Sequence, residues 1–353
     1  MIRIQLAGET KVVTKGVTVQ EVLEAWPGQS HPQIVAAIVG KDLRELSFCL
    51  TEDTTIMPVD LTHVDGVRIY SRSLMMVFIR AAKEIFPHCQ VRIMYSLSKG
   101  LYGELYIGRS LLEKDLRQIE QRMRTIIAAD EKIEKLRMPV EEAIKIFEEE
   151  GLTDKVKLMG YKQTKEISVY RCGDYYDYYF GYMLPSTGFL KEFELLFHLP
   201  GFILRFPSQA SPEKVPPYVE QRKLSQVFYE YEKWGEVLGV SDLASLNRLI
   251  EAKKGEELIR LAEALQEKKI AQIADEITRD RERVRLVMIA GPSSSGKTTF
   301  TQRLAIQLRV NGVRPVSLSL DDYFVSREFT PRNEKGEPDF EALEAIDLDL
   351  FNE

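Results

Sequence analysis

Apolar and polar residues alternate through the first 60 positions of the chain. The pattern is clearest in IRIQL (2–6), KVVTKGVTV (11–19) and IVAAIVG (34–40). A period of two residues turns one side of each segment toward a core, so it predicts β-strands, and the glycines and prolines between them predict turns. The segment EVLEAW (21–26) has helical spacing instead. We therefore expect a small β-rich domain with one helix.

Helical periodicity becomes stronger after residue 62, where helices are expected to alternate with strands. RSLMMVFIRAAKEIF (72–86) is typical of a buried helix, which ends before a proline. Ser110 and Glu113 have the spacing of a capping box. In the segment 112–126, apolar residues recur in steps of three and four, which predicts a second helix there.

Further helices are expected on either side of a tyrosine-rich stretch. Pro139 ahead and Gly151 behind bracket one of them, since proline favours the start of a helix and glycine its end. YRCGDYYDYYFGYMLPSTG (170–188) then predicts a strand followed by a turn. Residues 226–285 form a helical connector, which either packs on a neighbouring domain or binds a partner. Its apolar face comprises Leu258, Leu261, Leu265, Ile273 and Ile277.

The composition narrows the classes of protein to consider. The net charge is −6 without a basic block, which argues against a broad nucleic-acid surface. The longest apolar run, LMMVFI (74–79), is far shorter than the roughly 18 residues that a membrane span needs. Cys49, Cys89 and Cys172 lack CxxC spacing and the four histidines lack metal-ligand spacing, so neither a disulfide framework nor a zinc site is expected. We expect a cytoplasmic protein without membrane contact.

The segment GPSSSGKT (291–298) fits the phosphate-binding pattern G-x-x-x-x-G-K-[ST] in full. In such a loop the glycines let backbone N–H groups point at one phosphate, the lysine reaches the outer phosphates and the next hydroxyl ligates Mg²⁺. A buried strand, VRLVMIA (284–290), is expected before it, and a helix after it directs its positive end at the anion. The motif predicts a nucleotide site with Thr298 as magnesium ligand. The expected nucleotide-binding residues are Gly291, Ser293, Ser294, Ser295, Gly296, Lys297, Thr298 and Thr299.

Two acidic residues follow the next expected strand. VSLSL (316–320) runs into Asp321 and Asp322. A carboxylate at the carboxyl end of a strand beside the phosphate loop faces the same crevice. There Asp321 could accept a proton from a hydroxyl or hold Mg²⁺ through water. The alternative is a solvated acidic turn without a role in chemistry.

Segments from the last part of the chain resemble the uridine kinase and phosphoribulokinase family of P-loop kinases. They are GPSSSGKTTF (291–300), LDDYF (320–324) and PDFEALEAID (338–347). The resemblance implies ATP- and Mg²⁺-dependent transfer of a phosphoryl group to a hydroxyl of a small molecule, a nucleoside above all. It implies that Lys297 and Asp321 are the catalytic residues, with Asp321 as general base.

The same resemblance implies a substrate site and also departs from the family pattern. The residues implied to contact substrate are Asp322, Tyr323, Phe340 and Glu341. Glu341 and Leu343 stand where the family has aspartate and proline, which leaves the phosphate acceptor open. Only residues from Val287 onward correspond to the kinase domain. We therefore expect a C-terminally incomplete domain that would not turn over by itself.

The front of the chain resembles two modules of threonyl-tRNA synthetases. GVTVQEVL (16–23) and DLRELSFCLTEDTTI (42–56) are similar to a TGS domain, while AAKEIFP (81–87), DLRQIEQRMRTII (115–127) and the tyrosine-rich 170–188 are similar to the editing-type domain. The implied fold class is an α+β N-terminal region, a β-grasp domain plus an editing-like domain, followed by the start of an α/β P-loop domain. The implied domains are 1–61 (TGS-like), 62–225 (editing-like), 226–285 (helical connector) and 286–353 (P-loop).

The editing-like region lacks the residues on which editing depends. The family's H-x-x-x-H pair falls on Arg72 and Met76, and its later Cys-x-x-x-His falls on Tyr179 and Met183. Methionine, tyrosine and arginine supply neither the imidazole nor the thiolate that such chemistry uses. The resemblance therefore implies a retained fold without hydrolytic activity.

Two functional hypotheses from different classes follow. The leading one is a uridine kinase-like phosphotransferase behind a synthetase-derived region. The alternative is a regulatory or RNA-binding protein, in which the front domains bind tRNA and a nucleotide acts as the switch. The aromatic residues between Tyr170 and Tyr182 either stack on bases or line a sheet core with tyrosines turned outward. Their own segment is poor in Lys and Arg, which favours the core.

Overall fold

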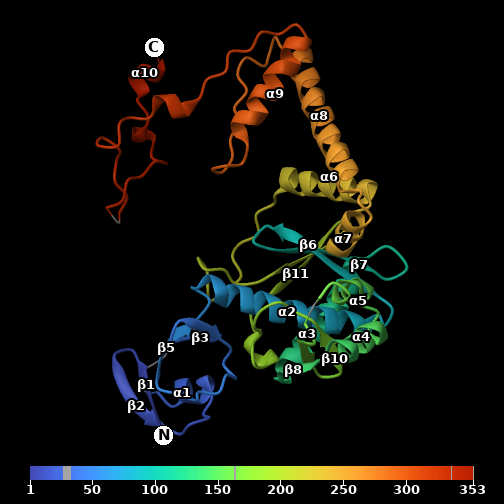
Figure 1. The fold of residues 1–353 in the computed structure, drawn as a ribbon, viewed down its shortest axis with the longest axis vertical. Coiled ribbons are helices and arrows are strands. Elements are labelled where there is room, and N and C mark those ends of the chain that lie inside the picture. The colour runs from blue at the N-terminus through green and yellow to red at the C-terminus, as the bar shows by residue number, and fades with distance from the viewer. Residues whose placement is uncertain (27–32, 163, 335, 353) are drawn as a thin grey trace. The chain divides into compact units, whose positions relative to one another are not determined.

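The structure is a computed structural model that describes residues 1–26, 33–162, 164–334 and 336–352. It is a mixed α and β structure with several sheets (Figure 1). The chain divides into two compact units, Met1–Arg248 and Leu249–Glu353, and we describe each by itself. In the described part of the chain, no helix is both long enough and apolar enough to cross a bilayer.

The first unit holds all of the strands in the described residues. The strands are β1 (Ile2–Leu6), β2 (Glu9–Val13), β3 (Ala36–Val39), β4 (Asp42–Arg44), β5 (Thr54–Val59), β6 (Gln90–Leu97), β7 (Gly100–Tyr106), β8 (Ile133–Pro139), β9 (Glu166–Cys172), β10 (Tyr175–Asp177), β11 (Glu194–His198) and β12 (Gly201–Arg205). Its helices are α1 (Val19–Glu24), α2 (Val64–Ile85), α3 (Glu113–Ala128), α4 (Val140–Glu149), α5 (Thr153–Met159), α6 (Arg222–Leu238) and the 3-10 turn η1 (Thr187–Phe189). Helix α7 (Leu243–Glu251) spans the boundary between the units.

The first sheet has the strand order β2-β1-β5-β3-β4 and carries α1 on one face (Figure 1). The predicted alternation is confirmed in β1, where Ile2, Ile4 and Leu6 are buried and the residues between them are exposed. The central pair β1 and β5 runs parallel, and the other pairs run antiparallel. Thr18 and Glu21 form a capping box that fixes the start of α1. The described residues among the first 60 thus form a strand-rich body with one helix.

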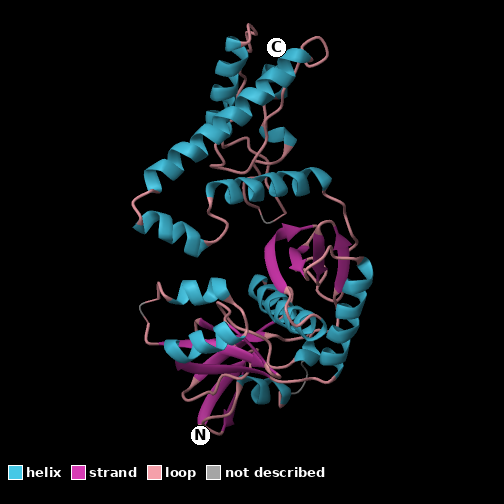
Figure 2. Ribbon diagram, turned by 90° about the vertical axis from the view of Figure 1, so that its right-hand side faces the viewer, coloured by secondary structure: helices cyan, strands magenta, loops and turns pink. Residues whose placement is uncertain are grey.

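The second sheet, β11-β12-β7-β6, packs one face against α2 and α3 (Figure 2). Helix α2 ends at Ile85, before the proline, as the sequence predicts. At the centre of this core the rings of Phe78 and Phe202 lie 4.3 Å apart. The buried face of α3 contains Leu116, Ile119, Met123 and Ile126, the apolar positions that recur in the sequence.

The start of α3 differs from the predicted capping box. The helix begins at Glu113, but Ser110 does not cap it. The buried carboxylate of Asp115 accepts a hydrogen bond from the backbone N–H of Leu112 at 3.0 Å. Arg109 holds the same carboxylate through both of its terminal nitrogens, at 2.7 and 2.8 Å. Asp115, which is held in place by Arg109, therefore caps the start of the helix instead of the predicted Ser110.

The third sheet, β10-β9-β8, is covered by α4 and α5. Helix α4 starts directly after Pro139, and Gly151 follows it with a φ of +70°, as the flanking residues predict. Phe147 is the largest fully buried side chain of this small core. The chain leaves β10 into the segment that contains the remaining tyrosines.

The second unit consists of helices and irregular segments in its described residues. They are α8 (Gly255–Arg279), α9 (Lys297–Val310), α10 (Leu348–Asn352) and the 3-10 turns η2 (Leu320–Tyr323) and η3 (Leu343–Ala345). Helices α8 and α9 pack through Ile270, Ala274, Leu304 and Leu308. The expected strands 284–290 and 316–320 are not formed. A parallel strand needs a neighbour for its backbone N–H and C=O groups, and no sheet is present in the described part of this unit.

Candidate functional site

The positions that correspond to the editing motif come together in the first unit. Met76 on α2 and Met183, after β10, are both buried in one cluster, and Tyr179 packs against it. The hydroxyl of Ser73 lies 4.0 Å from the sulfur of Met183. Thioethers thus fill the space between α2 and the tyrosine-rich segment, in contact with a phenol ring. This packing contributes apolar burial and supplies no nucleophile.

Arg72, the fourth of these positions, faces the same segment from α2. Its guanidinium donates a hydrogen bond to the carbonyl of Tyr182 and lies against Gly181, where an added Cβ would come within 2.9 Å of it. Gly181 also has a φ of +107°, a conformation that favours glycine. Burial lowers the pKa of Arg72, and the negative form of Tyr170 opposes this shift. Among the described residues, no group of three metal-ligating side chains is present.

An aromatic loop, Tyr176–Tyr182, runs past this position. Phe180 stands at its centre with 88% of its surface exposed. Every tyrosine of the loop has a cation over its ring, as the distances to the ring centroids show: Arg171 to Tyr176 5.6 Å, Lys162 to Tyr178 4.2 Å, Lys155 to Tyr179 5.2 Å and Lys135 to Tyr182 4.7 Å. A cation over the face of a ring is attracted by the ring's quadrupole, which helps to hold the orientation of the ring.

The cations over the aromatic loop come from other elements of the fold. Lys135 lies on β8, Lys155 on α5 and Arg171 on β9, while Lys162 follows α5. The tyrosine-rich segment is itself poor in Lys and Arg, as the sequence indicates, but the fold brings further cations to it from β8 and from α5 and the residues after it. Lys135 and Lys155 form ion pairs with carboxylates.

Two cations near the loop have no such pairing. Arg72 and Lys162 have no carboxylate within ion-pair distance among the described residues. Lys162 instead donates a hydrogen bond to the hydroxyl of Tyr178 at 2.5 Å. No carboxylate in the described residues neutralises these two charges.

The aromatic loop is anchored at both ends. At its start, the fully buried carboxylate of Asp177 accepts hydrogen bonds from the hydroxyl of Tyr175 at 2.8 Å and from the backbone N–H of Tyr178 at 2.7 Å, and it pairs with Lys155. At its end, the hydroxyl of Tyr170 donates to the carbonyl of Gly181 at 2.9 Å. Tyr170 on β9 and Tyr175 on β10 are buried, which differs from the expectation that the tyrosines of this sheet turn outward.

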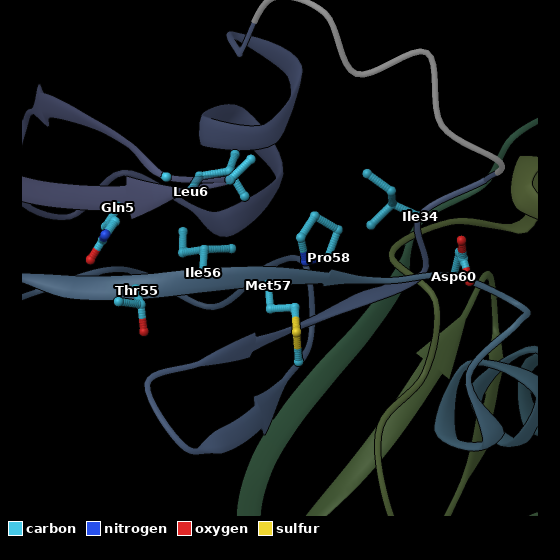
Figure 3. A pocket seen from close by; sticks show the side chains of 10 residues that line it. Gln5, Leu6, Ile34, Thr55, Ile56, Met57, Pro58 and Asp60 are labelled. Carbon is cyan, nitrogen blue, oxygen red and sulfur yellow. The ribbon is translucent and has the colours of Figure 1, made fainter. Parts of the chain in front are cut away.

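A groove of about 580 Å³ beside the first sheet is a second candidate (Figure 3). Leu6 and Ile56 from the paired strands β1 and β5 form its floor, and Pro58 and Ile34 continue it. Its charged residue, Asp60, already accepts hydrogen bonds from the backbone and hydroxyl of Thr62 at 2.8 and 2.6 Å. The groove therefore offers apolar surface without a free reactive group.

The phosphate-binding sequence forms a tight loop at the start of α9. The helix begins at Lys297, and Ser294 and Gly296 have positive φ angles of 60° and 86°. The ammonium group of Lys297 donates hydrogen bonds to the carbonyls of Gly291 and Pro292, at 2.8 and 3.0 Å. The lysine thus lies back over the loop and holds it curled. The loop is exposed, and Thr298 and Thr299 occupy the first turn of the helix.

The other residues expected at a kinase site form no hydrogen bond or ion pair with this loop in the described residues. Asp321 and Asp322 lie in η2 and are exposed. Tyr323 packs edge-on against Phe351, and Phe340 against Phe324, with centroid distances of 5.1 and 6.5 Å. The side-chain hydrogen bonds of residues 291–300 go to groups within the same segment, and none of them reaches Asp321. The backbone N–H of Glu341 donates a hydrogen bond to the carboxylate of Asp339 at 3.0 Å.

Comparison with curated proteins identifies threonine–tRNA ligases as relatives. The ligase of Acetivibrio thermocellus is 30% identical over 198 residues, which are 56% of this chain and 31% of the relative. That of Anaplasma marginale is 33% identical over 182 residues (51% and 29%), and threonine–tRNA ligase 2 of Bacillus subtilis is 28% identical over 196 residues (55% and 31%). The chain spans about a third of the length of these relatives. No family model matches the chain.

These relatives support one resemblance and contradict the other. They agree with the synthetase-like reading of the chain, including its TGS-like and editing-like segments. They are ligases, so the prediction of a uridine kinase-like enzyme acting on a nucleoside is wrong. The structure gives a physical reason, since the expected strands that would bring Asp321 beside the phosphate loop are not formed. The relatives of this chain are tRNA ligases, and its matches cover only part of their length.

Proposed function

We propose that this chain is a nucleotide-responsive RNA-binding protein that contacts the single-stranded end of a tRNA-like RNA without hydrolysing an ester on it. The observation that carries the proposal is the aromatic loop, with Phe180 exposed and a cation over each of its tyrosines. Relatives named as threonine–tRNA ligases support tRNA as the class of RNA. This function corresponds to the second of the two hypotheses raised by the sequence.

The chemistry of the aromatic loop suits a single strand. Unpaired bases stack on exposed aromatic rings, and nearby cations neutralise the phosphates between them. Phe180 offers such a ring, while Lys162 and Arg72 offer charges that no carboxylate neutralises in the described residues. The negative net charge of the whole chain disfavours binding along a duplex. Contact would therefore concentrate at this loop.

The absence of hydrolysis follows from what occupies the neighbouring space. Met76 and Met183 are buried there, and neither can activate water or bind a hard metal ion. The phenol of Tyr179 has a pKa raised well above its ordinary value, because burial and the adjacent Asp177 disfavour the phenolate. It therefore stays protonated near neutral pH and cannot serve as a base.

The domain assignment is part of the same proposal. Residues 1–61 would be a TGS-like domain, 62–225 the editing-like RNA-binding domain, 226–285 a helical connector, and 286–353 the nucleotide-binding part. In the last of these, the loop from Gly291 would bind ATP, with Thr298 as the ligand of Mg²⁺. The curled loop and the helix that starts at Lys297 support this assignment.

The salt dependence of RNA binding tests the proposal. Binding of the full chain to a fluorescently labelled threonine tRNA transcript would be measured by anisotropy from 50 to 200 mM KCl. We expect the logarithm of the affinity to fall with the logarithm of salt with a slope of about −1.4, because two neutralised single-strand phosphates contribute about −0.7 each. A transcript that lacks its single-stranded 3′ end should bind much more weakly. Equal affinity for both transcripts would refute the proposed contact.

Replacing Lys297 with alanine tests the nucleotide part. We expect ATP·Mg²⁺ affinity, measured by calorimetry, to fall at least tenfold, because the lysine supplies the main charge for the outer phosphates. Lys268→Ala, in the exposed part of α8, is the control and should leave the affinity unchanged. Unaltered ATP binding in the Lys297 variant would show that the loop is not the nucleotide site.

A further inference from the structure

Helix α6 is attached to the outer face of the second sheet by a small set of contacts. The ring of Phe228 stacks on Tyr95 of β6 with a centroid distance of 4.2 Å. The hydroxyl of Ser225 lies 3.1 Å from Nε2 of His198 on β11. No residue of α6 is fully buried. A helix held this lightly can separate from the sheet at a modest cost in free energy.

A buried carboxylate lies on the sheet beneath this helix. Glu104 on β7 is 7% exposed, and its two oxygens accept hydrogen bonds from the hydroxyls of Tyr102 and Tyr106. The two hydroxyl donors fix the position of this carboxyl group on the sheet.

Glu232 brings a second carboxyl group from α6 to the same place. It lies one helical turn after Phe228, on the side of α6 that faces the sheet. Its Oε2 atom is buried and has no hydrogen-bond partner in the structure. A buried, unpartnered carboxylate oxygen beside a second carboxyl group is unfavourable in its charged form, and a proton on Glu232 removes that charge.

We propose that a proton on Glu232 holds α6 on the sheet and that loss of this proton releases the helix, which makes its attachment sensitive to pH. Four residues form this pH-sensitive attachment: the acid pair Glu104 and Glu232 and the stacked pair Tyr95 and Phe228. None of them belongs to the aromatic loop, so the proposal does not depend on the proposed RNA binding.

The direction of the pH dependence follows from the groups that face Glu232. Burial raises its pKa, Glu104 and Glu236 raise it further, and Lys233 and Arg92 lower it in part. A raised pKa in the attached state means that this state binds the proton more tightly than the released one. Attachment is therefore strongest at acidic pH and weakens as the pH rises above the ordinary glutamate value of 4.5 and through the raised one.

The remaining groups around the pair do not reverse this direction above pH 6. Burial raises the pKa of Tyr95 and of Tyr106 to about 12, and that of Tyr102 still further, so all three stay neutral. Burial lowers the pKa of His198, which Glu220 opposes in part. His198 thus gains its charge only at more acidic pH, where that charge would weaken attachment.

Hydrogen exchange of α6 tests the proposal. Exchange of peptides that cover Arg222–Leu238 would be followed by mass spectrometry on the full chain at pH 5 and 8, with correction for the intrinsic pH dependence of exchange. In the wild type we expect protection to fall between these values, by no more than the tenfold per pH unit that one proton allows. The Glu232→Gln variant should lack this fall. Peptides of α8 serve as an internal reference.

Two further variants make the outcome decisive. Glu230→Gln, at an exposed position two residues before Glu232 and so on the other side of the same helix, should retain the fall in protection. Phe228→Ala removes the stacking on Tyr95 and should give low protection at both pH values, which defines the released state. A wild type without the fall, or a Glu232→Gln variant that shows it in full, would overturn the proposal.

Discussion

Replacing Phe180 with alanine will lower the affinity for the single-stranded end of tRNA by roughly 5- to 150-fold. Stacking of one base on an aromatic ring contributes about 1–3 kcal/mol, and the substitution removes the ring. Because 88% of the side chain is exposed, the change should leave the stability of the first unit within about 0.5 kcal/mol of the wild type. Fluorescence anisotropy with a labelled transcript measures the affinity, and thermal unfolding checks the fold.

Two controls separate stacking from charge and from general exposure. Phe329→Ala removes another exposed ring, 76% accessible and in the second unit, and should leave RNA affinity unchanged. Lys162→Ala should weaken binding and also make the salt slope shallower by about 0.7, because one phosphate contact is lost. The interpretation of the loop fails if Phe180→Ala and Phe329→Ala bind RNA equally well.

Replacing Arg80 with alanine will destabilise the first unit by about 3 kcal/mol. The buried guanidinium bonds to Glu84 at 2.8 Å, to Glu131 at 2.7 and 3.1 Å, and to the sulfur of Cys172 at 3.2 Å. It therefore joins α2 to the start of β8 and the end of β9. Removal of one member of a buried ion pair leaves its partners without compensation, at a cost of about 3–5 kcal/mol. We take the lower end because both glutamates are about one-third exposed.

The pKa of Arg80 agrees with this role. Burial alone would lower it, but Glu131, Cys172 and Glu84 outweigh burial and raise it. Urea unfolding followed by tryptophan fluorescence reports on the first unit, since Trp26 and Trp234 both lie there. Arg122→Ala, which removes a partner of Glu84 that is about one-third exposed, is the control and should cost about 1 kcal/mol or less. Similar losses for the two variants would show that Arg80 has no special structural role.

Much of the first unit is predictable from local patterns in the sequence. The alternation of Ile2, Ile4 and Leu6 marks β1, and the proline after Phe86 marks the end of α2. Both signals act over a few residues, so no knowledge of distant contacts is needed. The cap of α3 shows the limit, because Asp115 is chosen over Ser110 through an ion pair with Arg109 that no short pattern reveals.

The second unit shows why an apolar run is not yet a strand. VRLVMIA (284–290) and VSLSL (316–320) have strand-like composition, and both are irregular and mostly exposed in the structure. A strand is completed by hydrogen bonds to a neighbour, and the described residues of this unit contain no partner strand. The prediction of an α/β sheet around the phosphate loop depended on pairings that the sequence pattern alone cannot supply.

The sequence predicts that the candidate site lacks the editing residues, but it does not predict the cations that surround the aromatic loop. Replacement of the motif residues at Met76 and Met183 is visible in the sequence, and the structure buries both. The cations of the aromatic loop were missed because Lys135, Lys155 and Lys162 lie outside the tyrosine-rich segment. The kinase prediction was wrong because a phosphate loop is found with many chemistries and does not by itself define one.

Ultraviolet cross-linking followed by mass spectrometry tests the central claim most directly. The full chain would be irradiated with a threonine tRNA transcript, and the cross-linked peptides would be sequenced. We predict that nucleotides of the single-stranded 3′ end attach to the peptide that contains Phe180, and that Phe180→Ala abolishes this adduct while other adducts persist. Cross-links confined to other peptides, or a loop adduct that survives the substitution, would contradict the account.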